Sequence, residues 1–243
     1  MKKSFISLGI ASVIALSSCS PVKKAQVSNQ ENPVYEIAVR QVKDGMKADF
    51  EAARTNFIEI LIQQKGVSND REFSSFYALP EPDKREVFIG MTEYDSYKTP
   101  GQVQSKMSVV SKFIKFKKTM DLKAYVFVQP TEGGNFDLES LAAKPGQVLE
   151  LAVRKVKAGQ DAAFETSRKD FVNWLNKQEG VVGSWEFKVV GGADTEGLTV
   201  GMSVYESQEA FQGIAGKVQQ LPEAGKYFST FDPVALQYAA SIK

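Results

Sequence analysis

Two matching sets of glutamate, arginine and tyrosine residues are the side chains of this 243-residue sequence that could do chemistry. An arginine can hold the anionic group of a ligand, and a tyrosine can donate a proton or stack on a ring. In each set the glutamate and the arginine lie four positions apart, so on a strand both point to the same face, about 13 Å apart. The sequence therefore predicts a polar ligand site formed by Glu36, Arg40, Tyr94, Glu150, Arg154 and Tyr205.

The same residues also allow a purely structural interpretation. Buried charges must be paired and hydrogen-bonded, because an isolated charge is very costly away from water. A network of ion pairs that only fills the interior of the protein would meet this requirement without binding any ligand.

The absence of histidine narrows the possible chemistry. It excludes Ser-His-Asp and Cys-His catalysis and a histidine ligand for zinc or haem. The single cysteine, Cys19, has another predicted role, described next, so we do not expect a thiolate site either. We accordingly expect neither a metal nor a cofactor.

The first residues have the pattern of a secretory signal peptide. Lys2 and Lys3 precede an apolar run over residues 5–16, which is shorter than the roughly 20 residues of a transmembrane helix. Leu16-Ser17-Ser18-Cys19 resembles the lipobox of bacterial lipoproteins, which implies cleavage before Cys19 and attachment of acyl chains such as palmitate. We expect a lipid anchor in the cell envelope, and Ser20 after the cysteine favours the outer membrane. Removal of the two lysines with the leader leaves 28 basic against 29 acidic residues, which does not predict a nucleic-acid partner.

An internal repeat organises the rest of the chain. Residues 34–67 align with residues 148–181 at a constant offset of 114 positions, and 17 of these 34 positions are identical. Later matches such as Gly90 with Gly201 and Tyr94 with Tyr205 follow an offset of 111. The predicted organisation is a signal peptide over residues 1–18, a flexible tether over 19–33, a first unit over 34–130, a linker over 131–146 and a second unit over 147–243.

Each copy is predicted to contain strand, helix, strand, strand, helix and strand. Alternation of apolar and polar residues indicates strands, and the spacing of Phe50, Phe57 and Leu61 indicates an amphipathic helix that is repeated in the second copy. Pro222 should interrupt the last helix of the second copy. In the first copy we expect strands near residues 35–42, 70–77, 86–94 and 124–129, with the second helix over 101–119.

This order of elements is that of a ferredoxin-like unit. The sequence resembles the dimeric α/β barrel superfamily, and within it the antibiotic biosynthesis monooxygenase-like domains. The likeness is carried by Val42-Lys43-Asp44-Gly45 leading into a helix with Phe50, and by Tyr94-Asp95-Ser96 and Tyr205-Glu206-Ser207. It implies an α+β fold in which the two tandem units pack sheet to sheet within one chain, as a monomer with an internal pseudo-dimer.

This arrangement leads to a prediction about the two faces of each sheet. We expect the more apolar faces, such as Tyr35, Ile37 and Val39, to pack against the helices. The opposite faces should then point into the space between the sheets. That would place Glu36 and Arg40 near Glu150 and Arg154.

The sequence is compatible with three functions. The first is an envelope lipoprotein that binds a small aromatic or anionic ligand between its two sheets without catalysis. The second, which the resemblance implies, is a cofactor-independent monooxygenase or related oxidoreductase acting on a phenolic or quinone-like substrate through Tyr94 or Tyr205 with Arg40 or Arg154. The third is a scaffold for interactions with other proteins.

A lysine-rich run over residues 112–123 also has two interpretations. It suits a patch that contacts a membrane surface, and it equally suits the solvated end of an amphipathic helix. The second is the more common reason for such a run.

Overall fold

Both copies of the repeat fold as predicted into strand–helix–strand–strand–helix–strand units in the computed structural model, which describes residues 32–242. The predicted signal peptide, Cys19 and most of the tether lie outside the described residues. The first copy contains β1 (Val34–Val42), α1 (Lys47–Leu61), β2 (Val67–Leu79), β3 (Val87–Tyr94), α2 (Thr99–Gln104), α3 (Met107–Lys117) and β4 (Met120–Glu132). The second contains β5 (Val148–Val156), α4 (Asp161–Leu175), β6 (Val181–Gly192), β7 (Leu198–Tyr205), α5 (Gln208–Val218), α6 (Pro222–Ser229) and β8 (Phe231–Ser241).

The second helix of each unit is divided into two pieces. In the second copy Pro222 starts α6, because proline has no backbone N–H and fits the first turn of a helix but not its interior. In the first copy no proline marks the break; Lys106 adopts an extended conformation between α2 and α3. That division was not predicted from the sequence.

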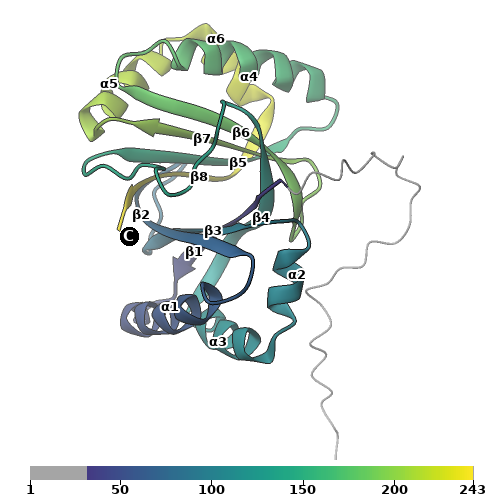
Figure 1. Ribbon diagram of the computed structural model, residues 1–243. Coiled ribbons are helices and arrows are strands. Elements are labelled where there is room, and N and C mark those ends of the chain that lie inside the picture. The colour runs from purple at the N-terminus through teal and green to yellow at the C-terminus, as the bar shows by residue number, and fades with distance from the viewer. Residues whose placement is uncertain (1–31, 243) are drawn as a thin grey trace, which may run out of the picture. The chain divides into compact units, whose positions relative to one another are not determined.

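The eight strands form one closed antiparallel barrel in the order β1-β3-β2-β8-β5-β7-β6-β4. The two copies are joined by the pairing of β2 with β8 and of β4 with β6. Figure 1 shows the helices of the first copy on one side of this barrel and those of the second copy on the other. The α+β fold with two ferredoxin-like units packed sheet to sheet is therefore confirmed.

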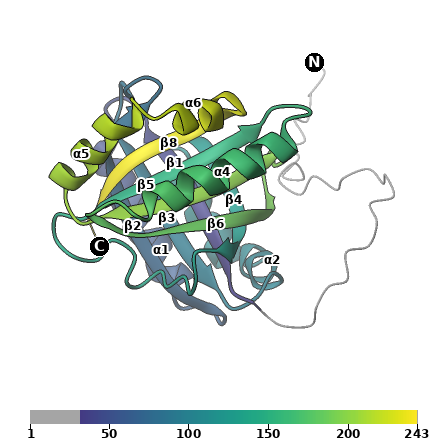
Figure 2. The same cartoon turned by 90° about the horizontal axis from the view of Figure 1, so that it is seen from above.

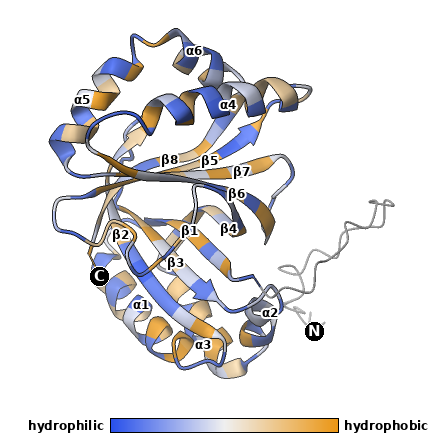
Figure 3. Ribbon diagram, turned by 45° about the horizontal axis from the view of Figure 1, so that its top comes forward, coloured by the Kyte–Doolittle hydropathy of each residue, from blue (hydrophilic) through white to orange (hydrophobic). Residues whose placement is uncertain are grey.

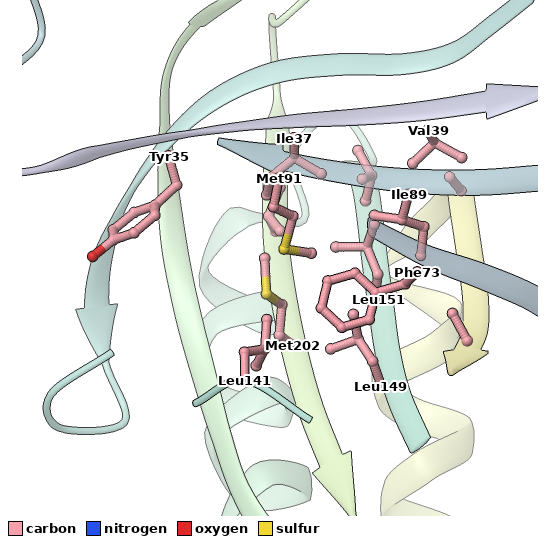
Figure 4. Close-up of a cluster of buried hydrophobic side chains, with 14 of the residues drawn as sticks. Tyr35, Ile37, Val39, Phe73, Ile89, Met91, Leu141, Leu149, Leu151 and Met202 are labelled. Atoms are coloured by element: carbon pink, nitrogen blue, oxygen red, sulfur yellow. The ribbon is translucent and has the colours of Figure 1, made fainter. Parts of the chain in front are cut away.

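The interior of the barrel is apolar, which corrects the predicted direction of the sheet faces. Tyr35, Ile37 and Val39 point inward with their counterparts from the second copy, and none of them packs against the helices. Figure 4 shows side chains of both sheets projecting into this shared space. The interior of an eight-stranded barrel is just wide enough for side chains to fill, and its strand backbones are already hydrogen-bonded to one another. It offers few partners to charged groups, so the apolar faces turn inward.

The segment that connects the two copies closes one end of the barrel. After β4 ends at Glu132, the chain places Leu138, Leu141 and Ala142 in the barrel core, all fully or almost fully buried. The ring of Phe136 makes an edge contact with Tyr35, with 4.8 Å between the ring centres. The segment that the sequence suggests as a linker is thus also part of the core.

The helices cover the outer face of each sheet and form a separate apolar layer there. Figure 2 shows α4 lying over the strands of the second copy, and Figure 3 shows the mixture of apolar and polar residues along helices and strands that such layers require. Within residues 32–242, no helix has the length and apolar character needed to span a membrane.

Candidate functional site

The six predicted site residues lie on the sheet faces that the helices cover. The guanidinium of Arg40 lies over the ring of Phe116 from α3, 5.3 Å from the ring centre. Arg154 lies over Phe164 from α4 at the same distance. The two sets therefore sit on opposite sides of the barrel. The prediction that they meet between the sheets is wrong.

The charged partners that explain this placement come from the neighbouring strand β2 and from helix α1. In the first copy Glu72, only 1% exposed, accepts hydrogen bonds of 2.5 Å from both Arg40 and Arg54. Arg54 belongs to the buried face of α1, and it also donates to Asp70 at 2.9 Å. Burial raises the pKa of Asp70 to about 6, although Arg54 acts in the opposite direction. Arg40 and Arg54 are thus both engaged in ion pairs.

The second copy repeats this arrangement with one change of partner. Arg154 donates to the two carboxylate oxygens of Glu186 at 3.2 and 2.5 Å and also to the hydroxyl of Tyr227. Arg168, which corresponds to Arg54, instead forms two hydrogen bonds of 3.0 Å with Glu132. Both copies therefore support the structural interpretation for their arginines.

Each arginine network lies over a glycine of the strand below it, which explains why Gly90 and Gly201 match in the repeat. A Cβ on Gly90 would collide with the guanidinium of Arg40, and one on Gly201 would lie 2.8 Å from a carboxylate oxygen of Glu186. Only glycine leaves room for the buried charge above the strand. The repeated glycine, together with an arginine inside the apolar stripe of the helix, was the sequence signal for these networks.

The glutamates form a second polar group beside each arginine network. Tyr94 donates to Glu36 at 2.8 Å, and Tyr125 receives a bond of 2.9 Å from Gln104. Burial raises the pKa of Glu36 to about 7, and hydrogen bonds from Tyr94 and Tyr125 lower it only in part. Glu36 can therefore exchange a proton near neutral pH, which is the property of a general acid or base.

The second copy has the same kind of group at Glu150. Tyr205 donates a hydrogen bond to this glutamate, and burial raises its pKa. Tyr238 also faces it, from the position directly opposite on β8. Sequence reasoning missed Tyr125 and Tyr238, because they occupy different positions of the repeat and no shared motif marks them.

Replacing Glu36 with glutamine should change how stability depends on pH. The folded protein favours the neutral form of the Glu36 carboxyl. The contribution of this carboxyl to the free energy of unfolding is therefore fully present below pH 4.5 and is lost as pH rises towards 7. Over this window the free energy of unfolding of the native protein should fall relative to that of Glu36→Gln by about 1–2 kcal/mol. The effect is no larger because Glu36 keeps part of its surface in water, which screens its charge. Urea denaturation of both proteins at either end of the window measures this. A difference between the two proteins that stays constant with pH would contradict it.

A small cavity lies between the sheet and the helices of the second copy. Its volume is about 30 Å³, and its polar lining includes Glu150, Arg154 and Glu186. A space of this size holds one or two water molecules. It cannot admit a ring-sized ligand in this conformation.

A much larger pocket, which we call the mouth pocket, opens at the end of the barrel opposite the connecting segment. It has a volume of about 430 Å³ and lies between the loop 80–86 and the beginning of β8, so both copies line it. None of the six predicted residues contributes to it. The sequence presents residues 79–84 only as a turn, and the pocket forms because distant strand ends meet there.

A single carboxylate in this mouth pocket receives donors from three strands. Lys123 of β4 pairs with Asp83, Gln237 of β8 donates to it at 3.1 Å, and Gln41 of β1 donates at 3.4 Å. Arg85 in turn donates to the amide oxygen of Gln41 at 2.7 Å. These side chains form a set of hydrogen-bond donors that is already placed to bind a carboxylate.

In the described part of the chain, no group of three or more Asp and Glu residues is placed to hold a metal ion.

Solved structures share this architecture over most of the chain. A candidate monooxygenase from Fusobacterium nucleatum aligns with 87% of this chain and 93% of its own, at 10% identity and a TM-score of 0.59. An anthrone oxidase-like protein aligns with 89% of this chain and 94% of its own, at 13% identity and a TM-score of 0.61. A candidate chlorite dismutase aligns with 87% and 96%, at 10% identity and a TM-score of 0.57.

The sequence matches no protein-family model and no curated protein. At identities of 13% or less, the structural likeness establishes the fold alone. The chain has the fold of a dimeric α/β barrel, with its two ferredoxin-like units fused in tandem.

Proposed function

We propose that this protein is an envelope lipoprotein that binds a small organic anion at the mouth of its barrel, between the two sheets. The observation that carries this proposal is the pocket of about 430 Å³ with donors converging on one carboxylate. Pockets of 300–1,000 Å³ with a few convergent polar groups are typical of small-molecule sites.

The lining of the mouth pocket suggests what kind of anion fits. Leu79, Pro80 and Val234 provide an apolar wall, while Lys123 and Arg85 provide positive charge. A carboxylate with an apolar or aromatic body matches both. The carboxylate of Asp83 occupies the donor set in the free protein, and an incoming carboxylate would take its place as the loop 80–86 moves aside.

Benzoate is the test ligand for this proposal. Asp83→Asn removes the internal competitor and should tighten benzoate binding about tenfold, the effect of one charge-assisted hydrogen bond. Lys123→Met removes the cation and should weaken binding by a similar factor. Isothermal titration calorimetry measures both effects.

The matched control is Asp232→Asn, which removes the same charge from an exposed position outside the pocket and should leave benzoate affinity unchanged. Equal affinities of the native protein and Asp83→Asn would refute the exchange of carboxylates. No binding by any of the four proteins would remove the mouth pocket as an organic-anion site.

The lipid anchor at Cys19 is the other part of the proposal, supported by the lipobox-like sequence. Labelling of cells with palmitate should mark the native protein and not Cys19→Ala. Equal palmitate labelling of Cys19→Ala and of the native protein would refute the anchor.

A second candidate function is the oxidation of a phenolic compound without a cofactor. It is favoured by Glu36, whose pKa of about 7 and bond from Tyr94 suit proton transfer from a phenol. Oxygen uptake with a panel of phenols and quinols tests it. Uptake that Glu36→Gln and Glu150→Gln do not reduce would separate the reaction from these groups, and no uptake would exclude it for that panel.

A further inference from the structure

The outer surface of α2 and α3 carries positive charge without any acidic residue. Residues 96–120 contain six lysines and neither aspartate nor glutamate. None of these lysines forms an ion pair with another described residue. We call this surface the basic face, and its lysines are Lys98, Lys106, Lys112, Lys115, Lys117 and Lys118, five exposed and Lys112 partly so.

The second copy shows that the fold does not require these lysines. Phe116 and Tyr227, 111 positions apart, both stack on the arginine of their copy, which fixes how the helices correspond. The corresponding residues 207–231 contain two lysines and two glutamates and are neutral overall. Where the basic face has Lys112, the second copy has Glu223. Two copies of one unit thus differ by six charges on the same surface.

Exposed apolar side chains accompany the charge. Met107 is 77% exposed, Tyr97 60% and Ile114 42%. At the positions of Tyr97 and Ile114 the second copy has Gln208 and Gly225. Lysines combined with exposed apolar side chains are typical of surfaces that lie in the interface of a membrane.

The described chain begins beside the α2 end of this surface, whereas Lys118 at the end of α3 lies beside Lys43, at the other end of β1. Val34 at the start of β1 pairs with Tyr94, directly before the segment that leads into α2. The residues between Cys19 and Val34 can span at most about 50 Å when fully extended. Because β1 itself is only about 30 Å long, the lipid anchor that forms part of the proposed function would keep the whole basic face within reach of the bilayer.

We propose that the basic face docks on the anionic headgroups of a lipid bilayer. Its charge is complementary to such headgroups, and Met107 and Ile114 can enter the interface beside them. A nucleic acid would use the lysines but leave these apolar side chains without a role. The bilayer is thus the partner that accounts for both observations.

The test uses residues 31–243, which form a compact unit and contain neither the leader nor Cys19, so that only the folded surface can bind. We expect co-sedimentation with vesicles of phosphatidylcholine and phosphatidylglycerol, little with phosphatidylcholine alone, and loss of binding at high salt. Each lysine near such a surface strengthens binding about fivefold, so Lys112→Gln, Lys115→Gln, Lys117→Gln and Lys118→Gln combined should weaken it by about a hundredfold or more.

The matched control removes four exposed lysines from the helices of the second copy and their flanking turns, as Lys169→Gln, Lys177→Gln, Lys217→Gln and Lys226→Gln. It should lose far less affinity, although its net charge is the same. Equal losses in the two variants would show that only net charge acts and would overturn the docking face. Tighter binding to duplex DNA than to the anionic vesicles at equal salt would assign the face to a nucleic acid instead. Because benzoate binding is measured separately, failure here leaves the mouth pocket untouched.

Discussion

Replacing Glu72 with glutamine should lower the free energy of unfolding by about 3–5 kcal/mol, the usual result of removing one partner from a buried ion pair. Glu72 is almost completely buried and is the shared acceptor of Arg40 and Arg54. Glutamine has nearly the same shape but no charge, so two buried guanidinium groups would keep only Asp70 as an ionic partner. Urea denaturation followed by circular dichroism at neutral pH measures the change.

An ion pair that joins the two copies supplies the control for this substitution. Glu132 also pairs with a buried arginine, Arg168, but its own side chain is about half exposed. Glu132→Gln should therefore lower stability by less than about 1 kcal/mol, as usual for exposed pairs. If the two variants lose the same amount, burial does not set the strength of these pairs.

Replacing Leu138 with alanine should cost about 2–5 kcal/mol, the range for truncating a buried leucine. Leu138 is fully buried at the closed end of the barrel, although it belongs to the segment that merely connects the copies in sequence. A flexible linker would tolerate this change. The midpoint and slope of urea denaturation measure the loss.

Leu122→Ala is the comparison for Leu138, because Leu122 lies on a strand but is about one-third exposed. This control should lose less than about 1 kcal/mol. Similar losses for both variants would mean that the connecting segment adds little to the core.

The order of elements and the pairing of the two copies could be predicted because they depend on local periodicity and on a strong repeat. The direction of the sheet faces could not be predicted from the strands alone. Both faces of β1 are buried, with Ile37 on one and Arg40 on the other, so its pattern does not reveal which face meets the helices. Arg54 lies inside the buried stripe of α1 and can only pair with a polar sheet face. It therefore identifies the face with Arg40 as the one that meets the helices.

The mouth pocket was beyond sequence reasoning for a different reason. Its donors Gln41, Lys123 and Gln237 come from three strands that are far apart in the chain. Their convergence depends on the closure of the barrel and on the conformation of the loop that carries Asp83. The amphipathic helices, in contrast, were predictable, but the exposure of Met107 depends on the unforeseen break before α3.

The pairing of β2 with β8 and of β4 with β6 has a consequence for how the two halves can diverge. When two identical chains build such a barrel, every mutation appears twice, and a change useful on one side is imposed on the other. Fusion into one chain removes that constraint. One half here carries the longer loop with Asp83 and the lysine-rich helices, while the other has a shorter loop and neutral helices. Covalent linkage has made the protein free to be asymmetric while the shared barrel keeps both halves folded.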